Sequence, residues 1–118
     1  MSLTFELFDH EPDVRVHEAG AEIFKAGSPG DVMFAVLEGQ VEIRRGGRAL
    51  ATMQRGEVFG EMAVIDHGPR SADAVALTKV RLAAIPPLRF MRLLQSNPFF
   101  GVQMMQNLCH KLRGDQSS

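Results

Sequence analysis

Short apolar runs separated by glycines make up most of this 118-residue chain. Nine of the eleven glycines lie at or before Gly68, and the runs between them are rich in Val, Ile, Phe and Leu. Glycine adopts turn conformations that other residues avoid, whereas β-branched and aromatic residues favour strands. Runs this short, with turn residues at such close intervals, are typical of an antiparallel sandwich or barrel. The segment from Val14 to Ile85 is therefore predicted to be all β.

Eight strands are expected in this segment. Arg45-Gly46-Gly47 and Arg55-Gly56-Glu57 are typical turn sequences, and Val41-Glu42-Ile43-Arg44 alternates as a half-buried strand should. Met33-Phe34-Ala35-Val36-Leu37 does not alternate, so both of its faces are expected to be covered. The predicted strands span residues 14–18, 22–25, 32–37, 40–45, 48–53, 57–59, 70–77 and 79–85.

The spacing of apolar residues changes after Ile85. Pro86-Pro87 ends the last strand, and apolar residues at helical spacing predict two helices over about residues 87–113. The second should begin at Pro98, behind an Asn97 cap, and end near Gly114. A further short helix is predicted over residues 3–8. Strands followed by helices indicate an α+β fold, mainly β.

The expected architecture is an antiparallel β-roll of the jelly-roll, or double-stranded β-helix, type. The roll should span about residues 14–85, with a short N-terminal helix, a one-turn helix within the roll and two C-terminal helices. The length of the chain predicts one domain over residues 1–118.

Composition and charge exclude several classes of protein. No apolar run approaches the roughly 20 residues that cross a bilayer, and no basic region leads an apolar one at the N-terminus. Neither a membrane span nor export is expected, and a cytoplasmic location is. Cys109 is the only cysteine, which excludes an internal disulfide, and its apolar helical surroundings predict that it fills the core.

Charge is divided unevenly along the chain. Residues 1–85 carry nine Lys/Arg and thirteen Asp/Glu, a net charge of −4, and residues 86–118 carry four and one, a net charge of +3. Four cations spread along helices are more simply a solvated surface than a nucleic-acid site, so no direct contact with nucleic acid is expected.

One stretch, from Val58 to Ala72, suggests chemistry. It combines a strand end, a glycine turn, a single apolar helical turn led by Glu61, a loop, and Arg70 at the start of another strand. The free N–H groups at a helix N-terminus attract anions, and the guanidinium fork matches a phosphate. Glu61 has the wrong charge for a phosphate but can accept hydrogen bonds from hydroxyls. The stretch therefore predicts a sugar phosphate as the ligand.

Phe59-Gly60-Glu61-Met62-Ala63 followed by Pro69-Arg70-Ser71-Ala72 resembles the phosphate-binding cassette of cyclic nucleotide-binding domains. These domains occur in catabolite activator proteins, cyclic-nucleotide-dependent kinases and cyclic-nucleotide-gated channels. Weaker similarities, such as Gly20 to Phe24, Gly30-Asp31 and Glu38 to Val41, extend the resemblance over nearly the whole chain. The ligand-binding residues that it predicts are Gly60, Glu61, Met62, Ala63, Arg70, Ser71 and Ala72.

The resemblance implies a role for each of these residues. Glu61 would bind the ribose 2′-hydroxyl and Arg70 the cyclic phosphate. The Ser71 side chain and the backbone of Gly60 and Ala72 would approach the phosphate, while Met62 and Ala63 would let the turn lie flat against the sheet.

The implied function is that of a non-catalytic sensor of a cyclic nucleotide, with cAMP as the expected ligand, cGMP as the open alternative, and no cofactor or metal. The long dimerising helix and the DNA-reading part of catabolite activators are not seen in the sequence. We therefore expect a free-standing sensor or one domain of a longer receptor, acting on a downstream protein or a fused effector domain.

Two other functions stay open. One is a domain of this fold that has lost nucleotide binding and serves protein interaction; the other is a β-barrel enzyme acting on sugars or nucleotides. The four histidines stand alone rather than at metal-ligand spacing, His67 is expected to face solvent, and no P-loop is present.

Three acidic residues complicate the interpretation of the stretch. Glu61 could simply complement a helix dipole, and Arg70 could pair with Asp66 or Asp73. Asp73 would also repel a bound phosphate unless it points away. Alternation along a strand predicts that it lies opposite Ala72 and Ala74.

Overall fold

The computed structural model describes residues 5–117, in two compact units that divide after residue 87. The first unit contains eight strands, as predicted. They are β1 (Val14–His17), β2 (Glu22–Phe24), β3 (Met33–Glu38), β4 (Val41–Arg45), β5 (Arg48–Met53), β6 (Val58–Phe59), β7 (Asp73–Ala76) and β8 (Val80–Ile85).

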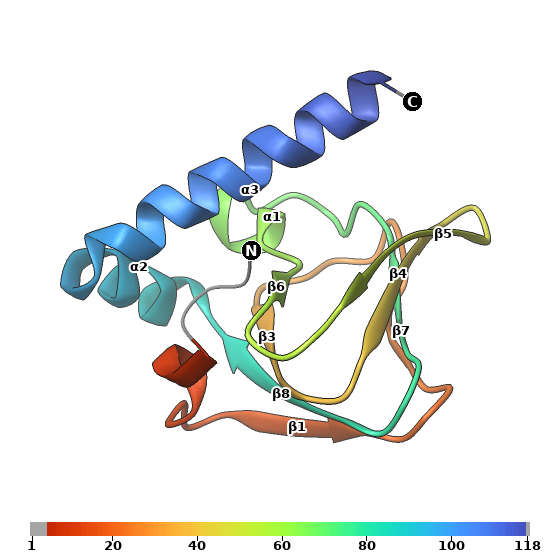
Figure 1. The fold of residues 1–118 in the computed structure, drawn as a ribbon, viewed down its shortest axis with the longest axis horizontal. Coiled ribbons are helices and arrows are strands. Elements are labelled where there is room, and N and C mark those ends of the chain that lie inside the picture. The colour runs from red at the N-terminus through yellow and green to blue at the C-terminus, as the bar shows by residue number, and fades with distance from the viewer. Residues whose placement is uncertain (1–4, 118) are drawn as a thin grey trace. The chain divides into compact units, whose positions relative to one another are not determined.

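The strands form two four-stranded antiparallel sheets, in the orders β1-β8-β3-β6 and β2-β7-β4-β5 (Figure 1). Each sheet takes strands from both ends of the segment, so the chain winds between the sheets as a roll. The predicted mainly β, α+β fold of jelly-roll type is confirmed. The core of the roll consists of Val32, Phe34, Val36, Val41, Phe59, Ala74, Ala76, Val80, Leu82 and Ala84.

Strand β3 is buried from Met33 to Leu37, which confirms the prediction from its lack of alternation. Phe34 and Val36 belong to the core of the roll, and Ala35, which lies between them, points to the other face. A 3₁₀ helix, η1 (Phe5–Phe8), also contacts β3. It is the described part of the predicted N-terminal helix, whose residues 3 and 4 lie outside the described residues.

The strand predicted over residues 70–77 was too long, because β7 begins only at Asp73. The backbone of Arg70 bonds to a loop instead of a neighbouring strand: its N–H donates to the Ser28 carbonyl, and its carbonyl accepts from Gly27. The remaining strands differ from the predicted ranges only at their ends.

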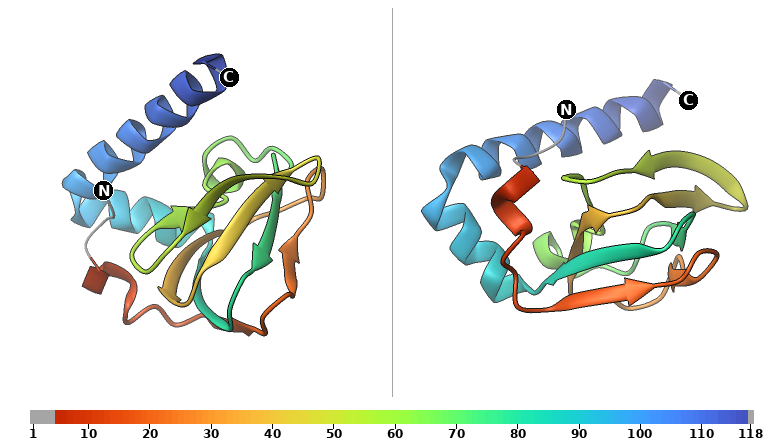
Figure 2. Two further views of the ribbon diagram at one scale, coloured as in Figure 1. Left: turned by 45° about the vertical axis from the view of Figure 1, so that its right-hand side comes forward. Right: turned by 60° about the horizontal axis from the view of Figure 1, so that its bottom comes forward.

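The second unit contains the two predicted C-terminal helices, α2 (Pro87–Ser96) and α3 (Pro98–Ser117), coloured from cyan to blue in Figure 2. The Asn97 side chain accepts a hydrogen bond from the Phe100 N–H at 3.3 Å, which is the expected cap. Within the unit, Phe90 and Phe100 meet edge to face, with ring centroids 5.9 Å apart. None of the described helices is long and apolar enough to cross a membrane.

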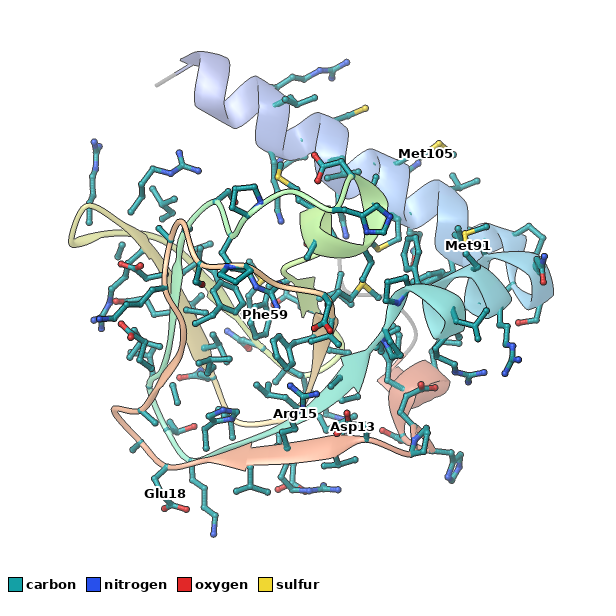
Figure 3. All side chains as sticks on the ribbon, turned by 180° about the vertical axis from the view of Figure 1, so that it is seen from behind. Asp13, Arg15, Glu18, Phe59, Met91 and Met105 are labelled. Carbon is teal, nitrogen blue, oxygen red and sulfur yellow. The ribbon has the colours of Figure 1, made fainter. Side chains whose placement is uncertain are left out.

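Two predictions about this unit were wrong. Helix α3 continues through Gly114, because a single glycine inside a helix costs only about 1 kcal/mol relative to alanine and does not end it. Cys109 is exposed rather than in the core, since the apolar positions of α3 do not all lie on its buried face. Met105 and Met91, labelled in Figure 3, are also exposed, whereas Met104 is buried.

Candidate functional site

The predicted one-turn helix is present as α1 (Met62–Ile65), directly after a tight turn at Gly60. Gly60 has a φ of +74°, a conformation that favours glycine, and it turns the chain sharply between β6 and α1. Glu61 is the N-cap residue of α1, but its side chain makes no capping hydrogen bond. The carboxylate is 2% exposed. Glu61 therefore does not cap α1 by a hydrogen bond, while its position at the helix N-terminus is still one that favours a negative charge.

Arg70 is a buried cation, 7% exposed, in the loop before β7. Its Nη1 donates to the Gly60 carbonyl at 3.2 Å, which brings the guanidinium next to the residue that precedes Glu61. The Nε atom is buried and has no hydrogen-bond partner among the described residues. The pKa of Arg70 is lowered from its ordinary value. Burial is the main cause; nearby Asp31 opposes the change, and the positive charge of Arg15 adds to it.

Three aromatic rings from β2, β3 and β6 support the Arg70 side chain. The rings of Phe24, Phe34 and Phe59 have centroids between 5.4 and 6.2 Å apart. The guanidinium carbon of Arg70 lies 4.2 Å from the Phe24 centroid, within the range of a cation–π interaction. The rings therefore stabilise a buried cation whose Nε–H group lacks an acceptor among the described residues.

Two glycines leave the space that the guanidinium fills. A Cβ at Gly30 would lie 2.2 Å from Nε of Arg70, and one at Gly60 would lie 2.6 Å from Nη1. Both contacts are shorter than real Cβ contacts, so any other residue would displace the guanidinium. From the sequence, Gly30 has no predicted role beyond its part in the resemblance, because its contact with Arg70 spans 40 residues of chain.

The neighbouring carboxylates do not pair with Arg70. Asp66 accepts a hydrogen bond from the Gly68 N–H at 2.8 Å, and Asp73 accepts one from the Ala26 N–H at 2.7 Å. Among the described residues no carboxylate lies within salt-bridge distance of Arg70. The alternative of a simple ion pair at this position is therefore not supported.

The other predicted site residues are distributed around this pair of charges. Ala63 and Ala72 are buried, Met62 is 37% exposed, and Ser71 is exposed, with its carbonyl accepting from Nε of Arg45 at 3.3 Å. His67 is exposed, as expected. The structure thus brings Gly60, Glu61 and Arg70 together, and it leaves Met62 and Ser71 at the surface.

Arg15, on β1, is a second cation near the site that sequence analysis did not select. It pairs in register with Leu82, a core residue, so it points into the roll, and its guanidinium carbon lies 5.7 Å from the Phe34 centroid (Figure 3). Asp13 forms an ion pair with it at 3.0 Å. Arg15 and its neighbours Val14 and Val16 are all exposed, so β1 lacks the alternation of buried and exposed residues that would have drawn attention to this arginine.

No metal centre is indicated. Among the residues that the structure describes, no three His, Cys, Asp or Glu side chains come close enough to hold a metal ion.

Comparison with known proteins identifies the family of this chain. The sequence model of the cyclic nucleotide-binding domain matches residues 14–97, which include both sheets and α2. The chain belongs to the cyclic nucleotide-binding domain family. This confirms the resemblance from the cassette residues.

Among its relatives is the cyclic AMP receptor protein of Thermus thermophilus, 35% identical over 104 residues, which are 84% of this chain and 48% of that protein. The crystal structure of Thermus thermophilus catabolite activator protein matches with a TM-score of 0.79 and 33% identity, over 88% of this chain and 51% of that one. A structure described as part of a cyclic-GMP-dependent signalling pathway that regulates bacterial phytopathogenesis also has a TM-score of 0.79, with 27% identity over 97% of this chain and 98% of that one. This chain spans about half the length of the first two.

Proposed function

We propose that this domain is a sensor that binds cAMP through its cyclic phosphate and its ribose. The observation that carries the proposal is the buried guanidinium of Arg70, whose Nε has no hydrogen-bond partner among the described residues, next to the turn that leads into buried Glu61. A buried ion is costly unless its hydrogen-bonding groups are satisfied. A bound phosphate would supply both the opposite charge and the missing acceptors.

The two charges divide the ligand between them. The guanidinium fork of Arg70 binds the phosphate oxygens, and the Glu61 carboxylate accepts from the ribose 2′-hydroxyl. Each charge-assisted contact contributes roughly 1.5 to 3 kcal/mol. Gly60 allows the close approach of the chain, and Met62, Ala63, Ser71 and Ala72 form the surrounding wall.

The choice of cAMP over cGMP is supported by the relatives. The relative named a cyclic AMP receptor protein matches 84% of this chain at 35% identity, whereas one named a cGMP-dependent protein kinase, from Caenorhabditis briggsae, matches only 54% of it, at 41% identity. cGMP is therefore the second ligand to test.

Binding itself is the proposed activity, without catalysis. A ligand that binds one conformation more tightly than another shifts the balance between them by that difference in affinity. Because the chain spans about half of the cyclic AMP receptor protein and of the catabolite activator structure, the proposed readout is a further domain or a partner protein. We propose a cytoplasmic location for this sensor domain.

The decisive experiment is thermal unfolding of the domain with cAMP, cGMP and 5′-AMP. A ligand at about 100 times its Kd stabilises the folded state by about 2.7 kcal/mol, which corresponds to several degrees in Tm for a domain of this size. We expect cAMP to give this shift, Arg70→Leu to abolish it, and Arg81→Leu, which removes a partly exposed arginine on β8 that pairs with Glu38, to retain it.

The other outcomes separate the remaining functions. No shift with any nucleotide at millimolar concentration would favour a protein-interaction module of the same fold. Conversion of cAMP to 5′-AMP during incubation with the protein, detected by chromatography, would instead show that the domain is an enzyme.

A further inference from the structure

We propose that Asp73 is a positioning residue for the anion site, because its carboxylate holds the loop of residues 25–30 against Arg70. The inference rests on the proposed function, since it assigns a role in nucleotide binding to a residue that does not itself contact the ligand. From the sequence alone, an acidic residue three positions after Arg70 looked like a source of repulsion.

The orientation of Asp73 removes that repulsion. Ala72 and Ala74 are 5% and 0% exposed, whereas Asp73 between them is partly exposed. Ala74 belongs to the core of the roll, so the Asp73 side chain points to the opposite face of β7. The predicted alternation is confirmed, and the carboxylate points away from the interior.

The carboxylate instead accepts a hydrogen bond from the Ala26 N–H, at 2.7 Å and across 47 residues of sequence. The last backbone pair of the β2–β7 ladder is Phe24 with Ala74. Beyond it the chain leaves the sheet and turns, and the Ser28 N–H bonds back to the Lys25 carbonyl at 3.2 Å. Asp73 therefore takes the place of the next backbone partner and ties the start of this loop to β7.

The loop that Asp73 holds contacts both the backbone and the guanidinium group of Arg70. The Gly27 N–H donates to the Arg70 carbonyl at 2.8 Å, and the Arg70 N–H donates to the Ser28 carbonyl at 2.9 Å. Gly30, at the end of the loop, lies directly against the guanidinium, since a Cβ there would be 2.4 Å from its central carbon. A movement of the loop would therefore change both the anchoring and the direction of the guanidinium.

The test compares the affinity for cAMP of the wild-type domain, Asp73→Ala, Asp73→Asn and Glu18→Ala, measured by calorimetry. Asp73→Ala removes the acceptor and should weaken binding about tenfold, as expected for a lost hydrogen bond to a charged group. Asn retains an acceptor oxygen in the same place, so Asp73→Asn should stay within about threefold of wild type. Glu18→Ala removes a negative charge at the exposed Glu18–Lys79 pair and should change nothing.

A double-mutant cycle shows whether Asp73 acts through Arg70. Gly30→Ala displaces the guanidinium by itself, so adding Asp73→Ala should then cost less than about twofold rather than tenfold, because coupled sites are not additive. A full second loss would mean that Asp73 acts elsewhere and would overturn the inference.

Other results are equally decisive. Wild-type affinity in Asp73→Ala overturns the inference while leaving the proposed function intact. If Asp73→Ala does not fold, Asp73→Asn decides: a loss of more than about tenfold there would mean that the charge, and not the hydrogen bond, is needed, and would overturn the inference. A wild-type domain that binds neither cAMP nor cGMP would overturn the proposed function and, with it, this inference.

Discussion

Two buried charges of opposite sign meet at one glycine in this molecule. Arg70 donates to the Gly60 carbonyl, and Glu61 follows in the chain, so both ions leave water within a few ångströms of the same turn. Ions of this kind are usually exposed, because removing them from water costs more than a weak pair returns. Burial of Arg70, whose Nε has no hydrogen-bond partner among the described residues, is the cost that the proposed phosphate would offset.

Replacing Glu61 with Gln tests its predicted contact with the ribose. The change removes the charge but keeps an acceptor oxygen, so binding of cAMP should weaken about five- to tenfold, the difference between charged and neutral hydrogen bonds. The 2′-deoxy analogue of cAMP lacks the hydroxyl, and its affinity should change much less. Equal losses for the two ligands, measured by competition with a fluorescent nucleotide, would exclude the 2′-hydroxyl as the partner.

Replacing Ser71 and Arg70 with alanine, one at a time, tests where the phosphate lies. A neutral hydroxyl contributes a weaker hydrogen bond than a guanidinium fork, so Ser71→Ala should cost a few-fold in affinity and Arg70→Ala at least about tenfold. Titration of each variant with cAMP gives the comparison. The reverse order would put the anion near Ser71, which is exposed, and away from Arg70.

At the scale of elements, a short helix and two loops form the site, and none of them would be ordered alone. Helix α1 has four residues, fewer than an isolated helix needs. The loop before β7 and the loop after β2 hold one another through the backbone of Arg70. Strand β7 begins at Asp73 rather than at Arg70 for this reason, and the freed arginine lies over Phe24.

Gly30→Ala tests the contact between these elements. The new Cβ would meet the flexible end of Arg70 rather than backbone, so the guanidinium can move aside and the fold should persist. We expect a Tm within a few degrees of wild type and a loss of cAMP affinity of at least about tenfold, since one charged contact is displaced.

A matched control is Gly20→Ala, in the turn between β1 and β2. Gly20 has a φ of +86° and no atoms near its Cβ position, so alanine there should destabilise the fold by about 1 kcal/mol without changing affinity. If the two variants lose affinity equally, general destabilisation and not Arg70 would be the cause.

At the scale of the whole molecule, the site depends on segments far apart in the sequence. Residues 25–30, 60–65 and 70–73 meet because two sheets of interleaved strands carry them. Binding of one ligand should therefore protect all three segments at once.

Hydrogen–deuterium exchange followed by mass spectrometry checks this expectation. With cAMP bound, amides in the three segments should exchange more slowly, because local opening of these loops would require release of the ligand. Residues 18–20, in the β1–β2 turn, should be unaffected and serve as the internal control. Protection confined to residues 60–65 would mean that the ligand does not contact Arg70.

The sequence by itself determined the eight strands, the one-turn helix, the two C-terminal helices and the family. These features follow from local rules: glycine positions, alternation, helical spacing, and a cassette whose residues are close together in the chain. The same rules also place Asp73 opposite Ala74.

Only the tertiary structure decided how Arg70 is held, that Arg15 points into the roll, that Gly30 must be small and that Asp73 bonds to Ala26. Each of these depends on contacts across 40 or more residues or on which strand lies beside which. Local preferences carry no information about such partners, because the free energy of these contacts exists only after the two sheets have formed.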